Sequence, residues 1–406
     1  MFATHSAAWR RLAIALAVLV TAGALLLWWL GGGIGTDSGV YRAGALAVLH
    51  GDPLYGNLRF LPDTSPGLPF TYPPVAALLF LPLAALPPQL VWGVFAVVTV
   101  LGLVLVLRSS ITAAVPGWLV LALGLGVFLL EPVWRGLGLG QINVVLMALV
   151  VLDVLVLPRN RYGGVLIGLA AAVKLTPLIF VLHLLVTGRR ADAARALGTF
   201  LGLNAVCLLV LPGDTLAFWR TQLLGGNNAT GASYGRNESL NGMIQRFLPH
   251  SDLAFPLAVL AGLACVAVAL PIARTLYRRG DNVGAMLVTA FCGLLVSPIS
   301  WTHHWVWLAP LAALLVSRAI RSPKLATITP IAVLAALGTG LCTMPPAGND
   351  AEQHWNLVQL LLGNCYVLGT LAVFAALALR LYLVRPSVVE LAELSPAIGT
   401  PAANRG

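Results

Sequence analysis

The chain has 406 residues, of which 59% are hydrophobic and only 9% are charged. A soluble domain carries roughly a quarter charged residues, because its surface has to face water. The composition therefore excludes a soluble protein and indicates one that lies in a lipid bilayer. The formal net charge of +10 comes without a basic run or an aromatic and basic module, so we expect it to face anionic lipid headgroups and not nucleic acid.

Apolar runs recur along the whole chain, several of them about 18 residues or longer, the length at which a helix crosses roughly 30 Å of hydrocarbon. A β-barrel would show segments of about 10 residues with alternating polarity, whereas these runs are continuously apolar. We expect an all-α, polytopic membrane protein of about 10–12 transmembrane helices. The uninterrupted runs are residues 12–30, 89–107, 112–130, 141–157, 196–211, 253–273, 283–298, 305–316, 325–344 and 357–379.

Two further apolar stretches carry helix breakers. Pro73 and Pro74 interrupt residues 72–86, and Lys174 and Pro177 interrupt residues 164–186. Irregular backbone at membrane depth is tolerated where it is buried in protein or lines a cavity. We therefore expect both stretches to form re-entrant or broken helices.

The basic residues are distributed unevenly over the connecting segments. With a cytoplasmic N-terminus, most of the 24 Lys and Arg residues fall on the cytoplasmic side, as positively charged loops prefer. This orientation places both termini in the cytoplasm and the two long hydrophilic loops, residues 32–71 and 213–251, outside the plasma membrane. We expect one multispanning catalytic domain over residues 1–384 and a disordered cytoplasmic tail over residues 385–406, rich in Pro, Ala, Gly and Ser.

Asp37 follows directly after the first apolar run, in Gly35-Thr36-Asp37-Ser38-Gly39-Val40-Tyr41-Arg42. A carboxylate at the boundary between membrane and water is well placed to take a proton from a polar substrate while a lipid-linked substrate lies beside it. The alternative is that Asp37 caps a helix over residues 38–49 and complements its dipole.

Lys174 lies near the middle of an apolar stretch, where an unpaired ammonium is costly. It could face a lipid phosphate in a cavity, or pair with Asp153, or extend toward water through the break at Pro177. His303 and His304 lie beside an expected turn among tryptophans, where an imidazole could bind a phosphate or a sugar hydroxyl or could belong to an interfacial aromatic belt.

Other polar side chains of the expected outer face suit sugar hydroxyls and phosphates. They are Glu131, Arg135, Gln141, Asn143, Arg236, Asn237, Glu238, Ser239 and Asn241. Five single cysteines and the absence of a Cys/His cluster or close acidic pair predict no disulfide framework, no metal site and no cofactor.

In their order along the chain, these segments resemble the polyprenyl-phosphomannose-dependent mannosyltransferases of glycosyltransferase family 87, within the GT-C superfamily of multispanning enzymes. The resemblance covers most of the chain, from Asp37 to His304. The matching segments are Asp37 with Tyr41, residues 51–55, residues 70–74 with Tyr72, residues 140–143, residues 174–177, residues 236–242 and residues 297–304.

The resemblance implies a GT-C-like fold with an active site open to the outer face, and Asp37 as the general base. It implies a polyprenyl phosphomannose donor and a mannosylated glycolipid acceptor, such as a phosphatidylinositol mannoside or lipomannan, in an inverting and α-1,2-forming reaction. Lys174, Arg135, Arg236 and one of the two adjacent histidines would bind the donor phosphate or sugar. Tyr41, Tyr72, Gln141, Asn143, Asn237 and Glu238 would bind the acceptor or sugar.

Two alternatives stay open at this stage. A transporter or flippase for a lipid-linked sugar would also need a lysine in a cavity, although it would not need Asp37 at the end of the first span. An enzyme of the same type could instead transfer arabinofuranose from polyprenyl phosphoarabinose.

Overall fold

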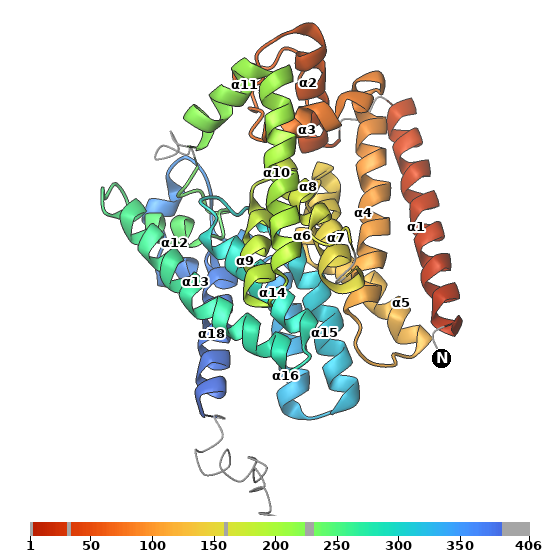
Figure 1. Ribbon diagram of the computed structural model, residues 1–406, viewed down its shortest axis with the longest axis vertical. Coiled ribbons are helices and arrows are strands. Elements are labelled where there is room, and N and C mark those ends of the chain that lie inside the picture. The colour runs from red at the N-terminus through yellow and green to blue at the C-terminus, as the bar shows by residue number, and fades with distance from the viewer. Residues whose placement is uncertain (1–2, 31–33, 158–160, 224–230, 384–406) are drawn as a thin grey trace, which may run out of the picture.

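The computed structural model describes residues 3–30, 34–157, 161–223 and 231–383. Within these ranges the chain forms helices and connecting turns, with no β-strand beyond one isolated bridge between Asn237 and Trp301. The all-α class is confirmed (Figure 1). The tail expected over residues 385–406 lies outside the described residues.

Several helices have the length and apolarity that a membrane requires. Three described helices are by themselves both long enough and apolar enough to cross a membrane: α4 (Pro88–Ser110), α10 (Arg190–Val210) and α13 (Ala254–Arg278). The expected first span, residues 12–30, overlaps the 27-residue helix α1 (Ala3–Trp29), which ends one residue earlier. Shorter apolar helices accompany them, among them α14 (Asn282–Val296), α15 (Leu308–Arg321), α16 (Leu325–Gly338) and α18 (Cys365–Leu383). The helical membrane class is confirmed, while the number of spans stays a prediction.

Both stretches with helix breakers are broken, as expected. The first forms α3 (Pro74–Leu79) and the 3-10 helix η1 (Leu81–Ala85). In the second, α8 (Val165–Val173) ends at Lys174, whose backbone is extended (φ −151°, ψ 130°), and the chain continues as η4 (Thr176–Leu178) and α9 (Ile179–Val186). A proline cannot donate the backbone hydrogen bond that would carry the helix through this point.

Two boundaries differ from expectation. Residues 131–140, expected as an outer connection, form α6 (Glu131–Leu139), which bends by 67° from α5 (Gly117–Gly126) and η2 (Val127–Leu129). Pro132 lies in the first turn of α6, where its missing N–H has no partner to lose. The expected run 357–379 is divided at Gly363 into α17 (Leu357–Leu362) and α18.

The described chain begins and ends toward the same end of the molecule, on opposite sides of it. In Figure 1, α1 begins at the lower right and α18 ends at the lower left. At the opposite end lie α2 (Thr36–His50), α3 and α11 (Pro212–Ala217). The shared end agrees with termini on one side of the membrane, and which side this is stays a prediction.

Shorter elements connect the long helices. They are α7 (Asn143–Val151), the π-helices η3 (Leu152–Val156) and η5 (Phe218–Leu223), α12 (Leu240–Phe247), and the 3-10 helices η7 (Thr302–Trp307), η8 (Leu341–Thr343) and η9 (Ala351–His354). Small residues allow close helix packing: a Cβ on Gly168 of α8 would overlap the carbonyl oxygen of Ala196 in α10. The five cysteines all lie in described residues and are buried.

Candidate active site

Asp37 lies in the first turn of α2, and the N-cap position belongs to Gly35, whose φ of 83° suits glycine. No side chain caps this helix, so the expectation that Asp37 is the cap is wrong. Its carboxylate instead accepts a hydrogen bond of 2.6 Å from Nε2 of Gln141, 104 residues along the chain. Burial raises the pKa of Asp37 above its ordinary value, an effect partly opposed by the Gln141 hydrogen bond and by the charges of Lys174 and Arg135.

Gln141 brings two tyrosines to the same place. The hydroxyl of Tyr41 donates to Oε1 of Gln141 at 3.0 Å, and the hydroxyl of Tyr72 lies 2.9 Å from that of Tyr41 and 3.4 Å from the same Oε1. The other side of the amide faces the Nε2 atom of His303 at 3.4 Å. Residues from four separate segments of the sequence therefore meet at one amide group.

Lys174 lies at the break between α8 and η4, which turns its side chain into the site. Its ammonium donates to Oδ1 of Asn143 at 2.8 Å and lies 3.1 Å from Nε2 of His304. It also lies 5.5 Å from the centre of the Tyr72 ring, within the range of a cation–π contact.

The expected alternative pairing of Lys174 with Asp153 is wrong. Asp153 accepts hydrogen bonds from the backbone N–H groups of Gly164 and Ile167, at 2.6 and 3.1 Å, and lies 3.7 Å from Arg189. These partners compensate the charge of the buried carboxylate and satisfy its hydrogen bonds. Asp153 thereby connects the start of α8 to Arg189, in the turn between α9 and α10.

The two adjacent histidines differ in their neighbours. The carbonyl oxygen of His303 accepts a hydrogen bond of 3.1 Å from Nδ2 of Asn143, and its ring faces Gln141. The ring of His304 faces Lys174, and its Nδ1 atom is buried without a hydrogen-bond partner. His303 thus belongs with Asp37 and His304 with Lys174, a division that adjacent positions in a sequence do not indicate.

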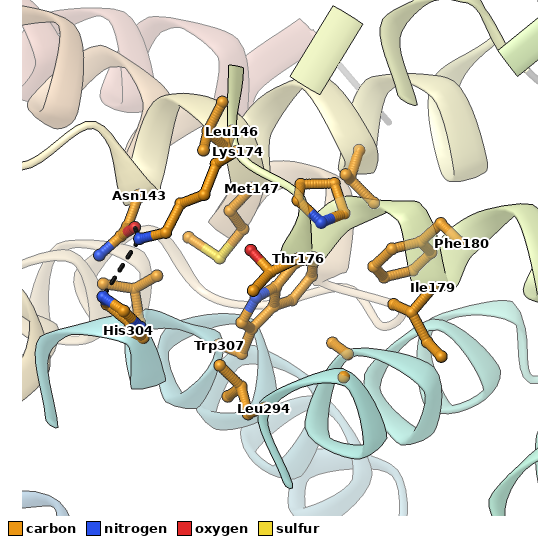
Figure 2. A pocket seen from close by; sticks show the side chains of 15 residues that line it. Asn143, Leu146, Met147, Lys174, Thr176, Ile179, Phe180, Leu294, His304 and Trp307 are labelled. Atoms are coloured by element: carbon orange, nitrogen blue, oxygen red, sulfur yellow. Dashed lines mark hydrogen bonds between the residues drawn. The ribbon is translucent and has the colours of Figure 1, made fainter. Parts of the chain in front are cut away.

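A small cavity of about 40 Å³ opens next to Lys174 (Figure 2). Lys174, Asn143 and His304 form one polar end. The rest of the lining is mostly apolar, and includes Leu146, Met147, Ile179, Phe180, Leu294 and Trp307 from α7, α9, α14 and η7. A cavity with a cationic end and an apolar body suits a ligand that joins an anionic group to a hydrocarbon chain.

A second carboxylate, that of Glu131, lies beside the histidine segment. Oε1 of Glu131 accepts a hydrogen bond of 2.7 Å from Thr302 and lies 3.7 Å from Nε of Arg135. Arg236 acts on the same carboxylate through its charge, and its Nη1 atom is buried without a hydrogen-bond partner. Arg135 and Arg236 therefore both act on the Glu131 carboxylate, which is bonded to Thr302 next to the two histidines.

Asn237 and Glu238 are fully buried and hold the turn before the histidines. Oδ1 of Asn237 accepts from the backbone N–H of Ser300 at 2.9 Å, and its amide nitrogen donates to the carbonyl groups of Ala232 and Pro298. The backbone N–H of Glu238 donates to Ser300 at 2.7 Å. Asn237 makes its hydrogen bonds within the protein, so it acts on the site through the position of residues 298–302.

Comparison with known proteins accounts for this constellation. Residues 70–298, more than half of the chain, match the model of glycosyltransferase family 87. The chain belongs to glycosyltransferase family 87.

Named relatives agree with this membership. The chain is 38% identical over 310 residues to the polyprenol-phosphate-mannose-dependent alpha-(1-2)-phosphatidylinositol pentamannoside mannosyltransferase of Mycobacterium tuberculosis (strain CDC 1551 / Oshkosh), covering 74% of this chain and 71% of the relative. It is 31% identical over 365 residues to the polyprenol-phosphate-mannose-dependent alpha-(1-2)-phosphatidylinositol mannoside mannosyltransferase of Mycobacterium tuberculosis (strain ATCC 25618 / H37Rv), covering 84% of each. No solved structure matches the chain.

Family 87 membership makes this protein a membrane glycosyltransferase and removes the support for a transporter. The site suits the acid–base and electrostatic chemistry of such an enzyme, because a carboxylate, two imidazoles and an ammonium converge in a partly dry space. Among the described residues, no three His, Cys, Asp or Glu side chains gather closely enough to hold a metal ion.

Some members of this family 87 site were not singled out from the sequence. Thr302 was not expected to take part in the site, although it lies between Trp301 and the two histidines. The apolar lining of the cavity was also not predicted, because its residues belong to runs that look like ordinary spans. Gln141 and Asn143 are only two positions apart, and this spacing is the signal in the sequence that both side chains enter the same site at the start of α7.

Proposed function

We propose that this glycosyltransferase moves mannose from polyprenyl phosphomannose to a hydroxyl of a phosphatidylinositol mannoside, with inversion at the anomeric carbon and formation of an α-1,2 linkage. The named relatives use the same donor type and act on phosphatidylinositol mannosides. The observation that carries the proposal is the linked pair of Asp37 and Lys174. A carboxylate and an ammonium that share one site match the two charges that the transfer needs.

The link between these two groups runs through side chains at measured distances. Asp37 contacts Gln141 at 2.6 Å, Gln141 contacts His303 at 3.4 Å, the His303 carbonyl contacts Asn143 at 3.1 Å, and Asn143 contacts Lys174 at 2.8 Å. A base and a cation joined in this way can act on the opposite sides of one sugar.

The proposed reaction is an in-line displacement. Asp37 removes a proton from the acceptor hydroxyl while that oxygen forms a bond to the anomeric carbon. The bond between this carbon and the phosphate oxygen breaks, and polyprenyl phosphate leaves with the electron pair. The negative charge that develops on the phosphate is stabilised by Lys174 and by His304, whose interaction is stronger in a dry site than in water.

The cavity supports the choice of donor. Its cationic end at Lys174 and His304 suits the phosphate, and its apolar lining suits the first isoprene units of the chain. Arg135 and Arg236 lie around Glu131 and offer further cations for the sugar or the acceptor headgroup.

The test uses purified protein in detergent, labelled polyprenyl phosphomannose, and phosphatidylinositol mannosides of increasing mannose number. We expect Asp37→Asn to bind donor and to lower transfer on the order of 10²–10⁴-fold, the usual contribution of a general base. Asp52→Asn is the matched control, because Asp52 lies in the same segment and is paired with Arg59 at 3.3 Å. Near-normal transfer by Asp37→Asn would remove Asp37 from this role.

The product also tests the reaction type. Mass spectrometry should show one added hexose, and specific mannosidase digestion should show an α-1,2 linkage. Polyprenyl phosphoarabinose supplied in place of the mannose donor should give no product. Transfer of arabinose, or transport of the intact donor without a new glycosidic bond, would contradict the proposal.

A further inference from the structure

The Gln141 side chain is the direct neighbour of the proposed base. An ionised carboxylate can only accept hydrogen bonds, so the group of Gln141 at 2.6 Å from Asp37 must be its NH2. Oε1 of Gln141 then faces the other way, toward the hydroxyls of Tyr41 and Tyr72 at 3.0 and 3.4 Å. The orientation of the amide is thus decided by the chemistry of its neighbours.

The donors of this amide both have partners within the protein. One N–H faces Asp37 and the second faces Nε2 of His303 at 3.4 Å, while Oε1 accepts from Tyr41 at 3.0 Å and has the Tyr72 hydroxyl 3.4 Å away. No amide N–H is therefore left to donate to a sugar hydroxyl, and the two tyrosines cover Oε1. Gln141 is also 94% removed from solvent, since its exposed fraction is 6%.

Packing holds the tyrosines and Gln141 in these positions. The Tyr41 ring stacks on Phe80 at 4.8 Å and contacts Phe95 edge-on at 5.1 Å. Gly140 precedes Gln141 with a φ of 68°, and a Cβ there would lie 2.5 Å from the hydroxyl oxygen of Ser38. The turn that carries Gln141 therefore packs directly on the first turn of α2, beside Asp37.

We propose that Gln141, oriented by Tyr41 and Tyr72, is a positioning residue that aims the Asp37 carboxylate and favours its ionised form, and that it does not bind the sugar. This inference rests on the proposed role of Asp37 as the base. It gives Tyr41 and Tyr72 the same indirect role, because their hydroxyls act on Asp37 through the Gln141 amide.

The direction of the effect follows from the groups that face Asp37. They are Tyr41 on its own helix, Tyr72 before α3, Gln141 before α7, Arg135 on α6, Lys174 after α8 and, through Gln141, His303 on η7. The hydrogen bond from Gln141 lowers the pKa of Asp37, while burial raises it. Loss of the amide N–H therefore raises the pKa of Asp37 further. As the pH falls, Asp37 is then protonated, and stops acting as a base, at a higher pH than in the natural protein.

The first experiment measures the pH dependence of kcat/KM for Gln141→Leu and Gln141→Met. Both variants lose the N–H group, and Gln141→Met keeps the length of the side chain without adding a charge beside Asp37. We expect kcat to fall on the order of tenfold or more, the acid limb to move to higher pH in both variants, and KM for donor and acceptor to change little. A residue that binds sugar would instead raise KM and leave the acid limb in place, which would overturn the inference.

The second experiment is a double-mutant cycle with Tyr41→Phe. Tyr41→Phe should lower kcat in the natural background and should have no further effect in Gln141→Leu, because its hydroxyl acts through Oε1. Tyr366→Phe, in α18 and outside this network, is the matched control and should leave both parameters unchanged. Additive effects of Tyr41→Phe and Gln141→Leu would contradict the proposed route.

Thermal unfolding in detergent accompanies each variant, and Gln141→Met preserves the side-chain length should Gln141→Leu fail to fold. The failures of the two proposals can be told apart. Activity of Asp37→Asn would reject Asp37 as the base, whatever the Gln141 variants do. An inactive Asp37→Asn together with an unmoved acid limb in Gln141→Met would keep the base and reject Gln141 as its positioning residue.

Discussion

The ammonium nitrogen of Lys174 lies 3.1 Å from Nε2 of His304. An ammonium has donors only, so Nε2 of this imidazole is the acceptor and the ring proton lies on Nδ1. Nδ1 is buried and has no hydrogen-bond partner. The cavity beside them thus begins with a cation and an imidazole whose N–H is not satisfied within the protein, as an anionic ligand would require.

Lys174→Met should lower kcat/KM for the donor by about 10²–10³-fold, because it removes the cation that stabilises the leaving phosphate. The measurement is transfer at subsaturating donor, with donor binding followed separately. Lys324→Met is the matched control, since Lys324 is exposed at the start of α16. Equal loss in both variants would show that the charge acts nonspecifically.

The pH profile of kcat/KM should show an acid limb above the ordinary aspartate pKa of 3.8. Burial raises the pKa of Asp37, and the base works only when deprotonated. Activity should therefore be complete above this raised pKa and should be lost as the pH falls through it. A limb at or below the ordinary value would contradict the assignment of Asp37.

Ala290→Phe should narrow the cavity, because Ala290 lines it from α14 and is buried. We expect KM for a long-chain polyprenyl phosphomannose to rise on the order of tenfold, and KM for a geranyl-chain analogue to change much less. The comparison of the two donors is its own control, since a folding defect would affect both equally. An unchanged KM for the long-chain donor would place the hydrocarbon chain elsewhere.

Arg246→Met should destabilise the protein by about 3–5 kcal/mol, the usual cost of breaking a buried charge network. The Arg246 side chain is buried and donates to the carbonyl groups of Tyr234 and Asn237, both at 3.0 Å, and to Oδ1 of Asn364 at 2.5 Å. Thermal unfolding in detergent measures the effect. Arg59→Met, at an exposed position, should change stability by less than about 1 kcal/mol.

Gly164→Ala should be far more destabilising than Gly188→Ala. Both glycines have positive φ, 94° and 81°, so alanine is strained at each by a similar amount. A Cβ on Gly164 would also overlap the carbonyl oxygen of Asp192, whereas a Cβ on Gly188 meets nothing within 4 Å. Equal unfolding temperatures of the two variants would show that the α8–α10 packing adapts without cost.

The sequence was sufficient for the class of protein and for the approximate positions of the long helices. Continuously apolar runs that are long enough to cross a bilayer form helices in lipid, because the hydrogen bonds of every backbone group must be made within the segment itself. The breaks at Pro73 and Lys174 were predictable for the same local reason, since proline and a buried charge interrupt an apolar helix. The bend before α6 was missed because Glu131 and Pro132 looked like the polar end of a span.

The chemistry of the site was predictable only as a set of residue types. Asp37, Lys174 and the two histidines stood out because charged or titratable groups are costly near lipid. Gln141 and Asn143 were also among the candidates, but their pairing with these groups was not predicted, because the hydrogen bond between Asp37 and Gln141 joins residues 104 positions apart and that between Gln141 and His303 spans 162 positions. Only the folded arrangement of α2, α7 and η7 decides which polar groups satisfy one another and which, such as Nδ1 of His304, are left without a partner.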